Sequence, residues 1–120
     1  MVFKDSGIAG IEMSFGEAEK ILKGMGFSRW TWDYHHATFD FKLEDKEIER
    51  DYYLRVRANA VKGRLESSKA VVRFEDPFMG KHILHKGMDY ESEIPPVHVE
   101  AARKIVESLK EKLSAQPQHH

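Results

Sequence analysis

Three arginines, Arg55, Arg57 and Arg73, lie in segments where polar and apolar residues alternate, and their side chains could bind an anion or a protein partner. A guanidinium donates paired hydrogen bonds to carboxylates and phosphates, and arginine is enriched in protein interfaces. Residues two apart on a strand point to the same face, so the alternation places these arginines on one face with Asp33 and Tyr53. We therefore predict a partner-binding or anion-binding site made of these five residues.

The reason to expect a partner is local excess positive charge. The predicted strand pairing places Arg57 beside Arg73, and like charges that face each other across strands repel. Asp33 and Glu75 relieve part of this repulsion, and a carboxylate from a second subunit or a small anion would relieve the rest. Replacing both arginines by Gln should then weaken self-association or anion binding with little effect on thermal stability.

Three interpretations of this charged face remain open. It is a solvated surface with weak ion pairs, a homodimer interface, or a site for phosphate, carboxylate or nucleic acid. A formal net charge of -1 argues against nucleic acid, which usually binds proteins with a clear basic excess. Single strands also need stacking aromatic side chains, and only Tyr53 is expected on this face.

A second group of residues that could do chemistry lies in the segment 77–94, which we expect to be a long loop. His82 and His85, with acidic residues nearby, contain enough nitrogen and oxygen ligands for a zinc-like site. Their spacing alone is a weak motif, and the segment also carries apolar residues that would pin it to the core: Phe78, Met79, Ile83, Leu84 and Met88. We predict that neither histidine binds metal.

No nucleophile with an orienting base is visible in the sequence. The chain has no cysteine, and Ser67-Ser68 falls in a predicted turn. There is no glycine-rich phosphate loop, and no predicted helix carries paired carboxylates at a catalytic separation. We therefore predict a non-catalytic binding or interaction module that self-associates and needs no cofactor. The alternative is a small metal-assisted hydrolase that uses the loop histidines.

The composition is that of a soluble globular protein. Of 120 residues, 41% are hydrophobic and 32% are charged, and the apolar runs are too short for a membrane span or a signal sequence. These features and the absence of cysteine predict a cytoplasmic protein. We expect one domain over residues 1–115, followed by a frayed tail at 116–120 that could include the start of a purification tag.

Two helices are predicted from their ends and their apolar spacing. Ser14 and Glu17 have the spacing of a capping box, and Gly26 can end the helix, which we place at about residues 15–25. Pro95-Pro96 can open the last helix. Its apolar stripe recurs every four residues and is widened by two more: the row is Val97, Ala101, Ile105, Leu109 and Leu113, and the additional residues are Ala102 and Val106. A short strand over residues 8–13 precedes the first helix.

Between the helices, apolar residues alternate with polar ones. A turn centred on His35-His36 would pair Trp32 with Phe39, on one buried face. Two more hairpins would pair Leu43 with Tyr52 and Ala58 with Val72 on the same face. This register predicts that both tryptophans, Trp30 and Trp32, pack in the core rather than line a ligand pocket.

These elements predict an α+β fold, specifically a two-layer sandwich. An antiparallel sheet of about five strands has two helices on one face, in the order β-α-β-β-β-β-α. The helices must cover this face, because it is the only large apolar surface on which they can bury their stripes.

Several local strings, together with the order of elements, resemble the small bacterial YugN-like family, whose function is unassigned. The strings are Trp32-Asp33-Tyr34, Asp51-Tyr52-Tyr53-Leu54-Arg55-Val56, and Gly80-Lys81-His82 followed by Gly87 and Asp89-Tyr90. The resemblance spans nearly the whole chain. It implies a fold similar to the TATA-binding-protein half-domain and helix-grip shapes, and it brings no catalytic residues.

Overall fold

A computed structural model describes residues 1–45, 50–83, 87–90 and 93–115. In chain order the elements are β1 (Glu12–Ser14), α1 (Phe15–Gly24), β2 (Ser28–Trp32), β3 (His36–Asp45), β4 (Arg50–Lys62), β5 (Val71–Phe74), β6 (Phe78–Ile83), β7 (Gly87–Asp89) and α2 (Pro96–Ser114). The predictions about Leu84, His85 and the tail at 116–120 lie outside the described residues.

The predicted start of α1 is confirmed, including the hydrogen bond by which the Ser14 side chain caps the helix. Ser14 precedes the helix in an extended conformation, and its Oγ accepts a hydrogen bond of 3.3 Å from the backbone N–H of Glu17. This bond satisfies one of the amide groups that the first turn leaves without a partner. After the helix, Gly26 adopts a φ of 104°, a conformation that favours glycine.

Helix α2 begins at Pro96 as predicted, and its buried residues all belong to the predicted stripe, although the first residue of that stripe is exposed. The buried residues are Ala102, Val106, Leu109 and Leu113, whereas Val97 is 69% exposed. A row spaced every four residues drifts by about 40° per step around a helix of 3.6 residues per turn. The buried stripe therefore has to alternate steps of four and three. In the described part of the chain, neither helix is long and apolar enough to cross a membrane.

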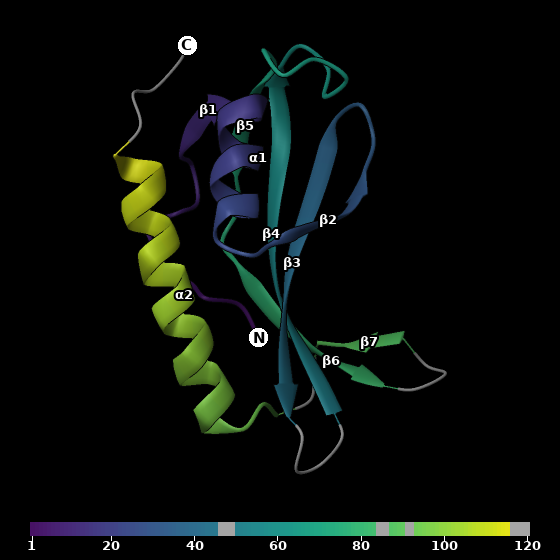
Figure 1. The fold of residues 1–120 in the computed structure, drawn as a ribbon, viewed down its shortest axis with the longest axis vertical. Coiled ribbons are helices and arrows are strands. Elements are labelled where there is room, and N and C mark those ends of the chain that lie inside the picture. The colour runs from purple at the N-terminus through teal and green to yellow at the C-terminus, as the bar shows by residue number, and fades with distance from the viewer. Residues whose placement is uncertain (46–49, 84–86, 91–92, 116–120) are drawn as a thin grey trace.

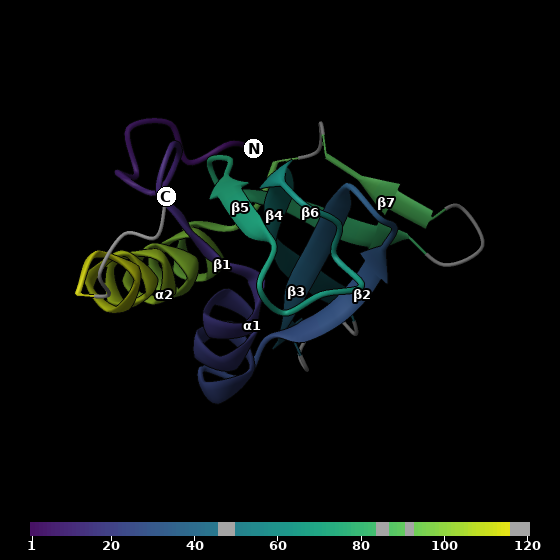
Figure 2. The same cartoon turned by 90° about the horizontal axis from the view of Figure 1, so that it is seen from above.

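The strands form one antiparallel sheet, with both helices on one face (Figures 1 and 2). The order is β1-β5-β4-β3-β2, and β6 pairs with both β4 and β7. Strand β4 is long enough to pair with β6 over Tyr52–Arg55 and with β5 over Ala58–Lys62. The two-layer α+β prediction is thus confirmed. The prediction of a loop over 77–94 is wrong, because this segment contributes β6 and β7 and so raises the sheet from five strands to seven.

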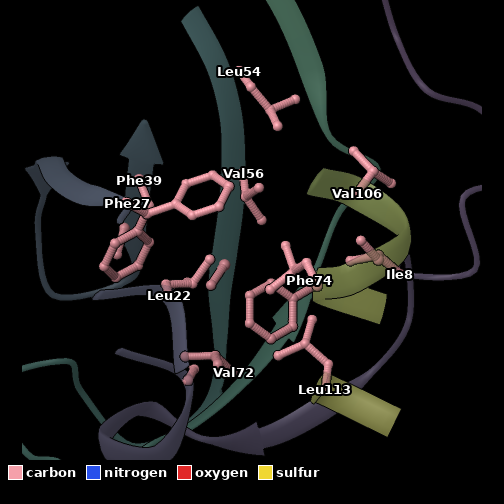
Figure 3. Packing of buried hydrophobic residues seen from close by; sticks show 14 of the residues in the cluster. Ile8, Leu22, Phe27, Phe39, Leu54, Val56, Val72, Phe74, Val106 and Leu113 are labelled. Atoms are coloured by element: carbon pink, nitrogen blue, oxygen red, sulfur yellow. The ribbon is translucent and has the colours of Figure 1, made fainter. Parts of the chain in front are cut away.

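The core lies between the helices and the inner sheet face. Phe39, Val56 and Phe74 point from the sheet toward Leu22 of α1 and Leu113 of α2 (Figure 3). The predicted register between β3 and β4 is confirmed, with Leu43 opposite Tyr52 and Phe39 opposite Val56. Every second residue of these two strands therefore faces the helices.

The predicted pairing of Trp32 with Phe39 is wrong, because the turn between β2 and β3 lies earlier than expected. Trp32 pairs with Ala37, and the turn is centred on Tyr34-His35. The Oδ1 of Asp33 accepts hydrogen bonds of 2.7 Å and 2.8 Å from the N–H groups of His35 and His36. Asp commonly stabilises a turn by bonding to backbone groups two or three residues ahead.

A β-bulge then reverses the faces of the first half of β2. The register shifts between Arg29 and Thr31, so Arg29 comes to lie opposite Phe39, on the helix side. There its guanidinium lies 3.3 Å from Glu19 of α1. Trp30 turns to the other face instead, which means that neither Arg29 nor Trp30 occupies its predicted side of the sheet.

The register between β4 and β5 also differs from the predicted one, by two residues. Ala58 pairs with Phe74 and Ala60 with Val72, whereas the sequence predicted Ala58 opposite Val72. A shift of two leaves every side chain on its predicted face. It changes the neighbours, however, because Arg73 now lies opposite Asn59 and not beside Arg57.

Candidate binding site on the outer face of the sheet

The outer face, which is the sheet face turned away from the helices, carries most of the predicted site residues. Three cross-strand pairs between β3 and β4 lie on this face: Lys42 with Tyr53, Asp40 with Arg55, and Thr38 with Arg57. The structure separates the five predicted residues, however. Arg55, Arg57 and Arg73 have three different surroundings. Asp33 lies near Arg57, and Tyr53 lies near Arg55.

Arg55 is a buried residue with only 3% of its surface exposed. Its guanidinium carbon lies 3.5 Å from the ring centroid of Trp30, and its Nη1 donates a hydrogen bond to the hydroxyl of Tyr90. The carboxylate of Asp40 lies 3.8 Å from Nη2. Stacking on an aromatic face stabilises a desolvated cation. Trp30, Tyr90 and Asp40 therefore hold Arg55 inside the protein, where an outside partner does not reach it.

Gly80 allows Tyr90 to reach this arginine. A Cβ atom on Gly80 would lie 2.6 Å from Cδ1 of Tyr90, so the ring packs directly on the glycine backbone. Phe78 supports the same ring edge to face, with 5.5 Å between the centroids. The position needs a residue without a side chain, although nothing in the local strand pattern indicates this.

We expect Gly80→Ala to lower the free energy of unfolding by about 1–3 kcal/mol, the usual cost of forcing an extra carbon into a packed site. Denaturant unfolding measures this change. The matched control is Gly24→Ala at the end of α1, where an added Cβ meets no atom within 4 Å. The control should be neutral or slightly stabilising, since Ala favours helix more than Gly does. Equal effects of the two substitutions would contradict the proposed packing.

Burial changes the acidity of the carboxylate beside Arg55. Loss of water around Asp40 raises the pKa of its carboxyl above the ordinary value, and the positive charge of Arg55 opposes this rise. The pair is therefore a partly buried ion pair in which the cation offsets the desolvation of the anion.

Arg57 is exposed and lies at a small pocket of about 170 Å³. The pocket is also lined by Thr31, Trp32, Asp33, His36 and Thr38. Among the residues that the structure describes, Arg57 forms no ion pair, in contrast to Arg55 and Arg73. Backbone hydrogen bonds from His35 and His36 lower the pKa of Asp33, so its carboxylate is stabilised as the anion by the turn itself.

A chain of side-chain hydrogen bonds crosses the sheet next to this pocket. Nδ1 of His36 lies 2.8 Å from Oδ1 of Asn59, and Nδ2 of Asn59 donates to Oε2 of Glu75 at 2.7 Å. Because the Asn59 amide oxygen faces His36, Nδ1 of the ring has to be the donor. The other ring nitrogen, Nε2, takes no part in this chain of hydrogen bonds. At the far end of the chain, one carboxylate oxygen of Glu75 is bonded to Asn59.

Arg73 does not take part in the predicted site. Its Nε and Nη2 donate to one carboxylate oxygen of Glu12 at 2.8 Å and 2.6 Å. The predicted repulsion between Arg57 and Arg73 does not arise, because the two-residue register shift separates them and β1 supplies an acid to Arg73. Pairing with β1 was not visible from the sequence near Arg73.

Tyr53 lies near His82 on β6, with 6.2 Å between their ring centroids. His82 is exposed, and its supposed co-ligand His85 lies outside the described residues. Within the described residues, no group of three or more His, Cys, Asp or Glu side chains could hold a metal ion. The prediction that the two histidines do not bind metal stays a prediction.

The aromatic edge, by which we mean Trp30, Trp32 and Tyr34, was missed by the sequence reasoning. These side chains are 52%, 48% and 49% exposed, although the alternation predicted them in the core. Each stacks with an arginine: Arg55 on Trp30, Arg29 at 5.1 Å from the Trp32 ring, and Arg64 at 5.5 Å from the Tyr34 ring. Asp33 lies between Trp32 and Tyr34, and Asp is frequent in turns. This residue could have indicated that the strand ends at Trp32.

Comparison with known proteins identifies similar chains. The family model described as YugN-like family matches residues 4–100. The uncharacterized protein YlbA of Bacillus subtilis (strain 168) is 33% identical over 99 residues, which cover 81% of each chain. The uncharacterized protein YugN of the same organism is 33% identical over 92 residues, 76% of this chain and 67% of that one. The crystal structure of the uncharacterized conserved protein YugN from Geobacillus kaustophilus HTA426 is 27% identical, covers 95% of both chains and has a TM-score of 0.83.

Proposed function

We propose that this chain, which belongs to the YugN-like family, is a non-catalytic cytoplasmic module that self-associates through the aromatic edge. The observation that carries the proposal is the exposure of about half of Trp30, Trp32 and Tyr34 on and beside one edge strand. Aromatic side chains and arginine are the residue types most enriched in protein interfaces.

The chemistry of the edge supports an interface rather than a solvated surface. Large aromatic rings gain free energy when water leaves them, and a cluster of such rings on a surface marks an interaction site. Arg29 and Arg64, which stack on Trp32 and Tyr34, add charged groups beside these exposed rings. An apolar centre with a charged rim is the usual anatomy of a protein interface.

A second copy of this chain is the partner that fits best. Strand β2 ends the path β1-β5-β4-β3-β2, so its outer side has no neighbouring strand in the described sheet. A net charge of -1 means that two copies repel each other little. The bulge at Trp30 interrupts regular pairing along this edge. We therefore propose that the two copies pack their aromatic side chains together rather than join their sheets by backbone hydrogen bonds.

Replacing Trp32 by Ala should weaken self-association at least roughly tenfold, because truncating a central interface tryptophan usually costs more than 1 kcal/mol. Sedimentation over a wide range of protein concentration measures the dissociation constant of the parent and the variant. Thermal unfolding of both proteins shows whether the variant remains folded.

The matched control is Val97→Ala, which removes an exposed apolar side chain from α2, an element outside the sheet. Its dissociation constant should equal that of the parent. A parent that stays monomeric at every concentration would refute the proposal, and so would a Trp32→Ala variant that dimerises as tightly as the parent.

A further inference from the structure

We propose that the pocket at Arg57 binds a phosphate group of a small ligand. This site shares Trp32 with the aromatic edge, but its central cation, Arg57, lies on β4 and is not part of that edge. Its lining is mixed: besides Arg57 and the indole of Trp32 it includes two threonines, one histidine and one acid, namely Thr31, Thr38, His36 and Asp33.

The first argument is the balance of charge around the pocket. Arg57 has no carboxylate partner in the described part of the chain, whereas the neighbouring acids are already bonded. Oδ1 of Asp33 accepts two backbone hydrogen bonds, and Oε2 of Glu75 accepts one from Asn59. Both acids keep their negative charge, but in the described part of the chain neither forms an ion pair with Arg57, so its guanidinium can still pair with an anion from outside.

The second argument is the arrangement of donors, which favours phosphate over carboxylate. A guanidinium offers a planar fork of N–H groups, and each threonine adds a hydroxyl that can donate. These groups come from three different strands, β2, β3 and β4. A tetrahedral phosphate presents oxygens in three dimensions, while a carboxylate presents two in one plane. The volume of about 170 Å³ admits the phosphate group but encloses little beyond it.

The third argument concerns the walls, which are held in place by the fold. Thr38 is buried and pairs with Arg57 across β3 and β4. His36 is oriented by its bond to Asn59, and Asp33 by its bonds to the turn. A site whose surroundings are already oriented loses little conformational entropy when a ligand binds.

The test is a titration of the full chain with inorganic phosphate, followed by the amide and indole signals in ¹H–¹⁵N spectra at constant ionic strength. Signals of Thr31, Trp32, His36 and Thr38 should shift together with one dissociation constant. Arg57→Gln should weaken this binding at least roughly tenfold, because it removes a charge-assisted pair of hydrogen bonds. Thr31→Val removes a hydroxyl without changing the charge and should weaken binding severalfold.

Arg73→Gln is the matched control, since it removes the same charge from the same face. Arg73 is already bonded to Glu12, so phosphate affinity should change less than about twofold. Equal losses in Arg57→Gln and Arg73→Gln would show a general charge effect and overturn the site. An absence of phosphate binding by the parent would overturn it too, and acetate binding as tight as phosphate binding would overturn the choice of ligand. Sedimentation of Arg57→Gln should still show the parent's self-association, so the two proposals fail independently.

Discussion

Replacement of Phe39 by Ala should lower the free energy of unfolding by about 3–5 kcal/mol, the usual cost of removing a buried aromatic ring. Phe39 is fully buried on the inner sheet face, where it lies opposite Val56 on the neighbouring strand (Figure 3). The loss combines the transfer of the ring to water with the cavity that remains. A domain of this size has only about 5–15 kcal/mol of stability, so a large part of it would be lost.

Denaturant unfolding of the parent and the variant, with the slope checked for constancy, measures this difference. Val97→Ala on α2 is the control, because it removes an exposed apolar side chain and should change stability by no more than about 0.5 kcal/mol. A change of only a few tenths of a kcal/mol in Phe39→Ala would mean that the residue does not belong to the core.

The second large effect is expected at Arg55, where substitution by Met should destabilise the protein by about 3 kcal/mol at neutral pH. Removing one partner of a buried pair leaves the other as an uncompensated charge. Here the remaining group is Asp40, and Arg55→Met also removes the hydrogen bond to Tyr90 and the stack on Trp30. The exposed pair between Arg73 and Glu12 provides the control, because Arg73→Met should cost less than about 1 kcal/mol.

The loss of stability caused by Arg55→Met should depend on pH, because Asp40 titrates, and the direction of this dependence follows from the shift of the Asp40 pKa. The pKa of Asp40 is raised in the folded protein, so this group favours folding when it is protonated and loses that contribution as the pH rises above its ordinary value of 3.8. Without Arg55 the pKa of Asp40 rises further. The difference in unfolding free energy between parent and variant should therefore grow from pH 4 to pH 7.

The double variant with Asp40→Asn and Arg55→Met isolates this coupling. It should recover part of the lost stability at neutral pH and remove most of the additional pH dependence, because no titrating group remains in the pair. A loss of stability in Arg55→Met that is the same at pH 4 and pH 7 would show that Asp40 and Arg55 are not coupled.

The features that the sequence predicted correctly are those that depend on neighbours in the chain. The cap at Ser14 and the start of α2 at Pro96 come from residues within one turn of each helix end. The face of each residue in β3 and β4 follows from alternation alone, so the burial of Phe39 was predictable. The two-layer architecture follows because the helices had only one apolar face to cover.

Alternation could not determine the registers, since a slip of two residues leaves every side chain on the same face. This ambiguity hid the pairing of Arg73 with Asn59 and Glu12. A bulge has the opposite effect, because one extra residue reverses the faces on one side of it. The bulge beside Trp30 therefore turned a predicted core residue into part of the aromatic edge.

By itself, the sequence determined that Arg55, Arg57 and Arg73 would share the outer face, because their parity along β4 and β5 depends only on the period of a strand. Which of them could meet a partner was decided by the tertiary structure. Trp30 and Tyr90 enclose Arg55, and Glu12 from β1 neutralises Arg73. Arg57 lines a small pocket and has no ion-pair partner in the described part of the chain. The physical reason is that burial and charge pairing depend on side chains from strands distant in sequence, and no local pattern records their positions.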